Sequence, residues 1–405
     1  MSIPRALVLS AALGTASLML AGCVPNAPAG SAIPVDMSDT DCVVELGEAP
    51  AGAIAFSLTN TGTDVNEFEI FAEDQLRIVG EKENVTPGST VDFVVQLQPG
   101  TYYTACKFQQ IGNPVGVAEF TVTGEPVEVS ADEQAQIDAA VTNYVSYVKS
   151  QTEELVPAVQ EFTAAYAAGD DDTARALFAS TRASYERIEP TAEAFGDLDP
   201  KIDYREVDAV AEDLDWTGFH RIEKDLWQPK PGGLNSDGTD AHLDWEPSTP
   251  DERQRFADAL VADIQELYDL VHSDDFTVSI ADISNGAIGL LDEVAAGKIT
   301  GEEDWWSHTD LTDFAANVQG AYVAFRTVSS IAAARSDEGT ALVASIEDEF
   351  AQLETVLAQY GSIASGFRSY DLVTDAERKE LSDQVNALAE PLSQLTHTIL
   401  SVDAG

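Results

Sequence analysis

The sequence predicts a multidomain protein in which an N-terminal β-sandwich is followed by an all-α helical bundle. Short β-rich runs alternate with turn signals between residues 33 and 124, whereas apolar residues recur at helical spacing from residue 130 to 405. The pattern changes at Gly124-Glu125-Pro126. A chain of 405 residues is also too long for one ordinary domain and suits two or three.

The predicted strands are short and separated by turn signals. These signals are Asn60-Thr61-Gly62, Pro87-Gly88 and Pro99-Gly100. A series of short, regularly spaced strands is typical of a small β-sandwich. The β-rich runs cover residues 53–58, 68–71, 76–79, 91–97, 102–106 and 120–123.

Capping signals divide the helical region. Ser130 with Glu133, and Thr374 with Glu377, fit capping boxes. Gly169-Asp170 indicates a stop and a new cap, and Thr249-Pro250 opens another helix. The last helix is expected to carry one apolar stripe, formed by Leu381, Val385, Leu388, Leu392, Leu395 and Ile399. We expect one or two packed bundles.

The N-terminus predicts export. Arg5 precedes an apolar run, Ala6 to Leu20, of signal-peptide length. Leu20-Ala21-Gly22-Cys23 resembles a bacterial lipobox, so residues 1–22 are interpreted as a lipoprotein signal peptide and Cys23 as the lipidated residue. Residues 23–32 read as a tether. The alternative is a plain secretory signal with a chance cysteine.

The charge of the chain excludes some partners and favours others. Asp and Glu number 71 against 21 Lys and Arg, a formal net charge of -50. Such a polyanion binds nucleic acid poorly and is repelled by anionic lipid headgroups, so membrane attachment must be covalent or inserted. It attracts cations, but acidity also keeps exported proteins soluble. A metal site must therefore rest on specific carboxylates.

The segment Gly218-Phe219-His220-Arg221-Ile222-Glu223 is the strongest chemical signal. His220 and Glu223 are three residues apart and share a face if the segment is helical. An imidazole with a carboxylate suits Zn, Fe or Mn, and iron-binding helical bundles use a related pair.

Two further segments are rich in carboxylates. In residues 182–205, Arg182, Glu186 and Glu189 fall on one helix face, for which the ordinary interpretation is a solvated, salt-bridged surface. In residues 301–311, the paired tryptophans are expected to pack. There His308 is either a ligand or a capping partner, and Thr309 is expected to cap a helix.

Four segments in this order resemble the imelysin-like (peptidase M75) family. They are residues 185–190, 218–224, 298–303 and 307–311. With a sandwich in front, the chain resembles the exported iron-binding components of a bacterial uptake system. The resemblance implies a cupredoxin-like fold for residues 33–124 and an imelysin-like helical domain for residues 130–405.

The resemblance also implies a site and partners. The metal ligands would be His220 and Glu223, with Glu189 and Asp203 next, and Arg205 would orient a ligand. The metal would be iron, Fe2+ or Fe3+, with Zn or Cu as alternatives. The implied partners are a membrane iron permease and an exported haem peroxidase. The lipid anchor would hold the chain at the outer face of the cytoplasmic membrane.

The N-terminal domain lacks the ligands of a blue-copper protein, because the first histidine of the chain is His220. Glu67, Glu69 and Glu81 are candidates for a second metal site. Cys42 and Cys106 either form a disulfide or ligate a metal.

The sequence favours a binding protein over an enzyme. Zincin peptidases need H-E-x-x-H, whereas Arg221 follows His220 directly and Lys224 stands four residues after it. The alternatives are a metallopeptidase-like enzyme and a structural or partner-binding surface lipoprotein.

Overall fold

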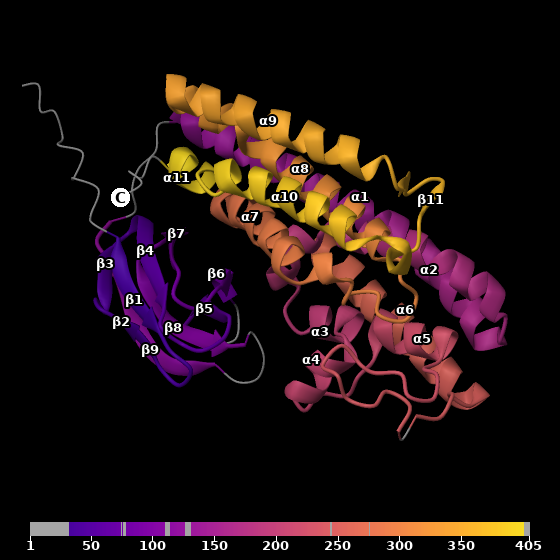
Figure 1. The fold of residues 1–405 in the computed structure, drawn as a ribbon. Coiled ribbons are helices and arrows are strands. Elements are labelled where there is room, and N and C mark those ends of the chain that lie inside the picture. The colour runs from indigo at the N-terminus through magenta and orange to yellow at the C-terminus, as the bar shows by residue number, and fades with distance from the viewer. Residues whose placement is uncertain are drawn as a thin grey trace, which may run out of the picture. The chain divides into compact units, whose positions relative to one another are not determined.

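The computed structural model describes residues 32–73, 75, 78–109, 114–125, 131–243, 245–274 and 276–400 (Figure 1). The described strands end at Thr123, apart from two strands of two residues each, and the described helices follow from Ala131 onward. The predicted fold class is therefore confirmed. The signal peptide, Cys23, the tether up to residue 31 and the Ser130 cap lie outside the described residues.

The sandwich consists of two sheets around an aromatic core. One sheet has the strand order β2-β1-β4-β7 and the other β3-β9-β8-β5-β6. Alternate residues of β4, including Phe56, point into the core, where the ring of Phe56 contacts those of Phe68, Phe93 and Phe120. The strands are β1 (Ile33–Met37), β2 (Cys42–Val44), β3 (Glu48–Pro50), β4 (Gly52–Asn60), β5 (Asn66–Phe71), β6 (Ile78–Val85), β7 (Thr90–Leu97), β8 (Gly100–Phe108) and β9 (Val115–Thr123).

A disulfide joins the two sheets. Cys42 lies in β2 and Cys106 in β8, and their Sγ atoms are 1.98 Å apart. Both side chains are buried. Because the sulfurs are bonded to each other, neither is a free thiolate that could ligate a metal.

Three of the helix starts predicted for this domain are confirmed by side-chain caps. Thr249 and Thr374 form capping boxes with Glu252 and Glu377, and Asp170 caps its helix. The last predicted helix is divided, because α10 ends at Leu392 and α11 begins at Leu395. The elements are α1 (Ala131–Ala168), α2 (Asp171–Glu186), η1 (Glu189–Phe195), α3 (Leu198–Asp203), α4 (Glu206–Ala211), α5 (Gly218–Trp227), α6 (Pro250–His272), α7 (Ile280–Ala296), η2 (Lys298–Thr300), α8 (Asp310–Arg335), α9 (Asp337–Leu357), β10 (Gly361–Ser362), β11 (Gly366–Phe367), η3 (Tyr370–Leu372), α10 (Asp375–Leu392) and α11 (Leu395–Leu400).

Helix α8 is the central helix of this domain. It packs against α7, α9, α2 and α1, and buried residues occur on all its sides. Asp310 and Asp313 in its first turn are also buried. The start of α8 thus brings acidic side chains into the interior. Within the described residues, no helix combines the length and the apolar character needed to span a membrane.

Candidate metal centre

A glycine sets the position of the histidine helix. Gly218 begins α5 with φ at +80°, and a Cβ there would lie 2.1 Å from the backbone oxygen of Ile202. Only glycine allows this approach. The start of α5 therefore lies against the end of α3, and His220 comes near Asp203, the last residue of α3.

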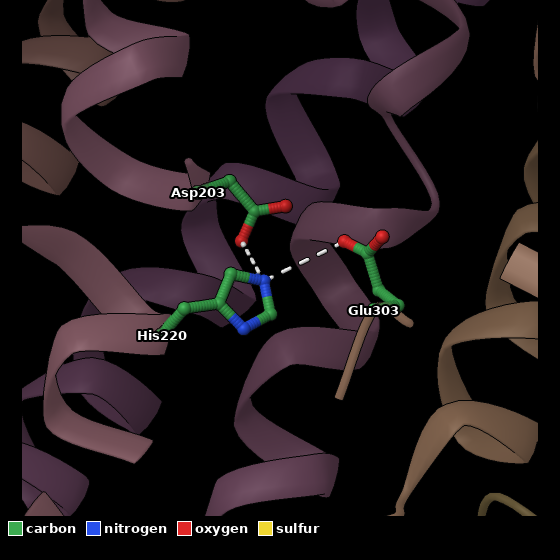
Figure 2. Close-up of side chains that lie close together, drawn as sticks. All are labelled: Asp203, His220 and Glu303. Carbon is green, nitrogen blue, oxygen red and sulfur yellow. Dashed lines mark ion pairs between the residues drawn. The ribbon is translucent and has the colours of Figure 1, made fainter. Parts of the chain in front are cut away.

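The Nε2 atom of His220 faces two carboxylates (Figure 2). It lies 3.6 Å from Oδ1 of Asp203 and 3.5 Å from Oε1 of Glu303. The three residues come from α3, α5 and the turn segment between η2 and α8. Their donor atoms lie within 4.8 Å of one another, which is close enough for one metal ion to contact all three.

The Nδ1 atom of the same ring is held by Glu223. It lies 3.1 Å from Oε2 of Glu223. The other oxygen of Glu223 accepts hydrogen bonds from the backbone N–H groups of Trp306 at 3.0 Å and Ser307 at 2.7 Å. Asp304 Oδ1 is 3.9 Å from Nδ1 and completes a second ligand group, His220, Glu223 and Asp304. Glu223 therefore fixes both the imidazole and the neighbouring turn.

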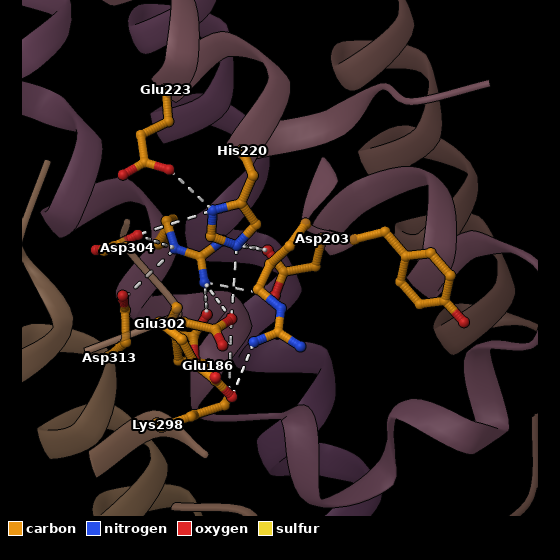
Figure 3. Close-up of polar contacts among 12 residues, drawn as sticks. Glu186, Asp203, His220, Glu223, Lys298, Glu302, Asp304 and Asp313 are labelled. Carbon is orange, nitrogen blue, oxygen red and sulfur yellow. Dashed lines mark hydrogen bonds and ion pairs between the residues drawn. The ribbon is translucent and has the colours of Figure 1, made fainter. Parts of the chain in front are cut away.

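Two buried cations, Arg182 and Lys298, lie among the carboxylates. Figure 3 labels Lys298 and several of these carboxylates. Arg182 is fully buried and pairs with Glu186, Asp203, Glu303, Asp304 and Asp313. Lys298 pairs with Glu189 at 2.6 Å and also lies near Glu186, Glu293 and Glu303. These ion pairs offset the cost of burying so many carboxylates.

Several buried polar atoms of this centre have no hydrogen-bond partner. They include Nε2 of His220, Oδ1 of Asp304 and both carboxylate oxygens of Asp313. Unpaired polar atoms in an interior are costly, and an arriving cation would satisfy them. An imidazole with several carboxylate oxygens is also a donor set that suits iron. The residues present therefore fit a metal ion.

The carboxylates determine the protonation of His220. Burial lowers the pKa of His220 and so does the charge of Arg182, but the hydrogen bond to Glu223 and the nearby carboxylates of Glu303 and Asp203 raise it to about 10. Burial raises the pKa of Asp313 well above its usual range, and the charge of Asp304 adds to this. The pKa of Glu303 lies well below its usual range, because Lys298 and His220 outweigh its burial.

The structure brings together three of the four residues expected as ligands. The fourth, Glu189, and the expected orienting residue Arg205 have other partners. His220, Glu223 and Asp203 meet at the centre. Glu189 lies beyond the end of α2, where it contacts Lys298 and accepts a hydrogen bond from Asn317. Arg205 pairs with Asp208 at 2.7 Å and with Glu302 at 2.9 Å.

Other expected residues have different surroundings. Thr309 occupies the N-cap position of α8, but its hydroxyl makes no capping bond and donates to Asp304 instead. His308 has a positive φ of 58°, and its backbone N–H donates to the backbone oxygen of Asp304.

Sequence reasoning missed several members of the centre, among them Glu303, Asp304, Asp313 and Arg182. Glu303 and Asp304 belong to an acidic run that was noticed, but nothing local indicated that the run turns towards His220. Arg182 was interpreted as part of a solvated face, and this was wrong because Arg182 is 0% exposed. The spacing of an arginine and a glutamate four residues apart is the same on an exposed helix face and a buried one.

The sandwich carries a separate acidic group. Glu67, Glu81 and Glu83 have carboxylate oxygens within 4.8 Å of one another. Glu69 is buried next to them in β5 but lies outside this set of three. Burial raises the pKa of Glu67, against the opposing charge of Lys107.

Comparison with known proteins agrees with the two-domain arrangement. Residues 140–395 match the family model described as imelysin, peptidase M75, and residues 8–117 match the model of a cupredoxin-like domain. The chain is 36% identical over 387 residues to the iron uptake system component EfeO of Escherichia coli. The EfeO of Shigella flexneri gives the same identity, and in both cases 95% of each chain is covered.

The chain belongs to the imelysin family. Its match to the EfeO relatives includes the cupredoxin-like domain as well as the imelysin domain, because the alignment covers 95% of this chain. The centre around His220 thus lies within the imelysin domain.

Replacing Gly218 with alanine should weaken metal binding in this imelysin domain. The added Cβ meets the backbone of Ile202, so α5 must move away from α3 and His220 from Asp203. The left-handed φ adds strain of about 1 kcal/mol or more. We expect at least a tenfold loss of affinity by titration calorimetry.

Gly289→Ala is the matched control for this variant, since a Cβ at Gly289 in α7 meets nothing within 4 Å. Equal affinities for the Gly218 and Gly289 variants would show that the approach of α5 to α3 does not build the site.

Metal binding should release protons near neutral pH. With a pKa of about 10, His220 is protonated in the metal-free protein, and a metal at Nε2 must displace that proton. Apparent affinity should therefore rise about tenfold per pH unit from pH 6 to 8. Calorimetry with ferrous iron in buffers of different ionisation enthalpy measures the release. An affinity that does not change with pH would contradict this.

Proposed function

We propose that this chain captures iron outside the cytoplasmic membrane and passes it to a membrane iron permease. One observation carries the proposal, namely that the unpaired Nε2 of His220 lies between Asp203 and Glu303 in a buried, acidic centre. The similarity to iron uptake components of known systems supports iron as the cargo. A negatively charged protein also concentrates cations near its surface.

Of the two ligand groups, the one on the Nε2 side is the better iron site. There His220, Asp203 and Glu303 contribute one donor each. Glu223 already uses both its oxygens, one for Nδ1 and one for two backbone N–H groups. A metal-bound histidine commonly has its other ring nitrogen held by a carboxylate in this way. Glu223 is then the residue that orients His220.

A small pocket leads to the proposed ligands. His220 and Glu303 lie on it, so an ion can approach them without crossing the apolar core. Glu206 and Glu302 add negative charge, and Arg205 lies beside Glu302. Carboxylate oxygens favour Fe2+ or Fe3+, while Zn2+ and Cu2+ are competitors because imidazole also suits them. The pocket is lined by Arg205, Glu206, Val207, Trp216, His220, Glu223, Asn235, Ser236, Glu302, Glu303, Trp305 and Trp306.

The sandwich offers a second, weaker metal site. Its ligands would be Glu67, Glu81 and Glu83, with Glu69 nearby. No histidine stands in this domain, so its donors are oxygen atoms alone.

An exported haem peroxidase is the proposed further partner of the uptake system.

Binding and release fit this site better than hydrolysis. A zinc peptidase needs an open coordination position with a bound water and a general base beside it. Here the carboxylate of Glu223 orients the histidine and holds the turn, and no H-E-x-x-H motif occurs in the chain.

Removing the proposed ligands should abolish tight iron binding. His220→Ala and Glu303→Gln should each lower affinity by more than the roughly 10- to 100-fold typical of residues that only support a ligand. His272→Ala and Glu347→Gln are the controls, since His272 lies near Glu153 and Glu347 pairs with Arg326. Titration calorimetry measures the iron affinity, and elemental analysis measures the iron content. Unchanged iron content in His220→Ala would refute the site.

A lipid on Cys23 should anchor the protein to the membrane. Cys23→Ser should move the chain from the membrane fraction to the soluble fraction and abolish labelling with radioactive palmitate. The matched control is the double variant Cys42→Ser/Cys106→Ser, which keeps Cys23 and should still be labelled. Palmitate labelling that persists in Cys23→Ser, or that is absent from the unaltered chain, would disprove the anchor.

A further inference from the structure

The proposed iron site already contains a permanent cation. Arg182 pairs with Oδ1 of Asp203 and lies 3.5 Å from Oε1 of Glu303. These are the same two oxygen atoms that face Nε2 of His220. A guanidinium does not lose its proton at any physiological pH, so this charge cannot be removed by titration.

The position of Arg182 is the one that a second metal ion would need. In two-metal centres the ions lie about 3.5–4 Å apart and share carboxylates. Here Asp203 and Glu303 are the carboxylates that could be shared, and the guanidinium already contacts an oxygen atom of each. Its Nε atom also lies 3.7 Å from Asp304 and 3.5 Å from Asp313.

Packing keeps the guanidinium in this place. Arg182 is 0% exposed, and its Cζ atom lies 5.9 Å from the ring centre of Phe178 and 5.4 Å from that of Phe219. Aromatic faces attract a guanidinium, and they leave it no route to solvent. Glu186, four residues further along α2, pairs with the Nη2 atom of the guanidinium.

We propose that Arg182 acts as a built-in second cation that restricts this site to a single metal ion. Di-iron bundles supply a Glu-x-x-His motif from each of two helices. In the part of the chain that the structure describes, His220 is the only histidine in the candidate ligand groups. This inference rests on the proposed iron-binding function and determines how many ions the site holds.

The test counts the ions at this site. All proteins carry Glu67→Gln and Glu81→Gln, so that the acidic group of the sandwich cannot contribute. Native mass spectrometry after loading with ferric citrate should give one ion for the parent and two for Arg182→Met. Electron paramagnetic resonance should show an isolated ferric ion in the parent and a loss of signal per iron in the variant, because carboxylate-bridged ferric ions couple.

Two controls test whether the number of bound ions depends on a positive charge at position 182 in particular. Arg182→Lys keeps a cation among the same carboxylates and should still hold one ion. Arg253→Met removes a partly buried arginine that pairs with Asp171, outside the site, and should also leave one ion. If Arg182→Met does not fold, the double variant Arg182→Met/Asp313→Asn keeps the net charge of the parent and should bind two ions.

The outcomes distinguish the two proposals. Two ions in the parent, or one ion in the folded Arg182→Met or double variant, would overturn the role of Arg182 while iron capture stands. No ion in the parent would overturn both. One ion in the parent and two in the variant would establish Arg182 as the residue that sets the number of ions.

Discussion

The contact between the guanidinium of Arg182 and the carboxylates around it is the interaction on which the polar centre of the helical domain depends. Ionised carboxylates in an interior repel one another and lose their hydration, and leaving one without its partner costs on the order of 3–5 kcal/mol. Arg182 contacts carboxylates from α2, α3, α8 and the turn before α8. It therefore holds together elements that are far apart in the sequence.

The centre is built where elements begin and end. Asp203 is the last residue of α3, Glu186 the last of α2 and Asp310 the first of α8. Helix ends leave backbone groups unpaired, so polar side chains are better tolerated there than in the middle of a packed helix. A metal ion bound among them, as proposed, would link these ends. Such an ion would stabilise the fold by about 4 kcal/mol at a free concentration of a thousand times Kd.

Contacts between residues close together in the sequence could be predicted, whereas few contacts between residues far apart could. Capping boxes at Thr249 and Thr374 and the helical pairing of His220 with Glu223 depend on residues three apart, so they could be predicted. The strands β2 and β3 were missed because runs of three residues are too short to show alternation. The strand β1 does alternate, but it contains Pro34, which weakens a strand prediction.

The distant features depend on tertiary packing. Glu303 reaches His220 across 83 residues, and no local pattern encodes that approach. The family resemblance pointed to Asp203, which a sequence pattern alone could not place beside the histidine. The burial of Arg182 likewise follows from the packing of α2 and α8 against each other and not from the spacing within α2.

The turn segment that carries Glu303 has a consequence for the lifetime of the bound ion. Asp203 and His220 stand on helices, whereas Glu303 stands on a turn that Glu223 fastens through the N–H groups of Trp306 and Ser307. Withdrawing Glu303 from a bound ion would break these two hydrogen bonds and the ion pairs of Glu303 with Arg182 and Lys298, but it would move no helix. At the proposed site, the dissociation rate would therefore depend on this turn, and the equilibrium affinity on the whole ligand set. A partner that pulls on the turn would take the ion quickly even from a site with high affinity.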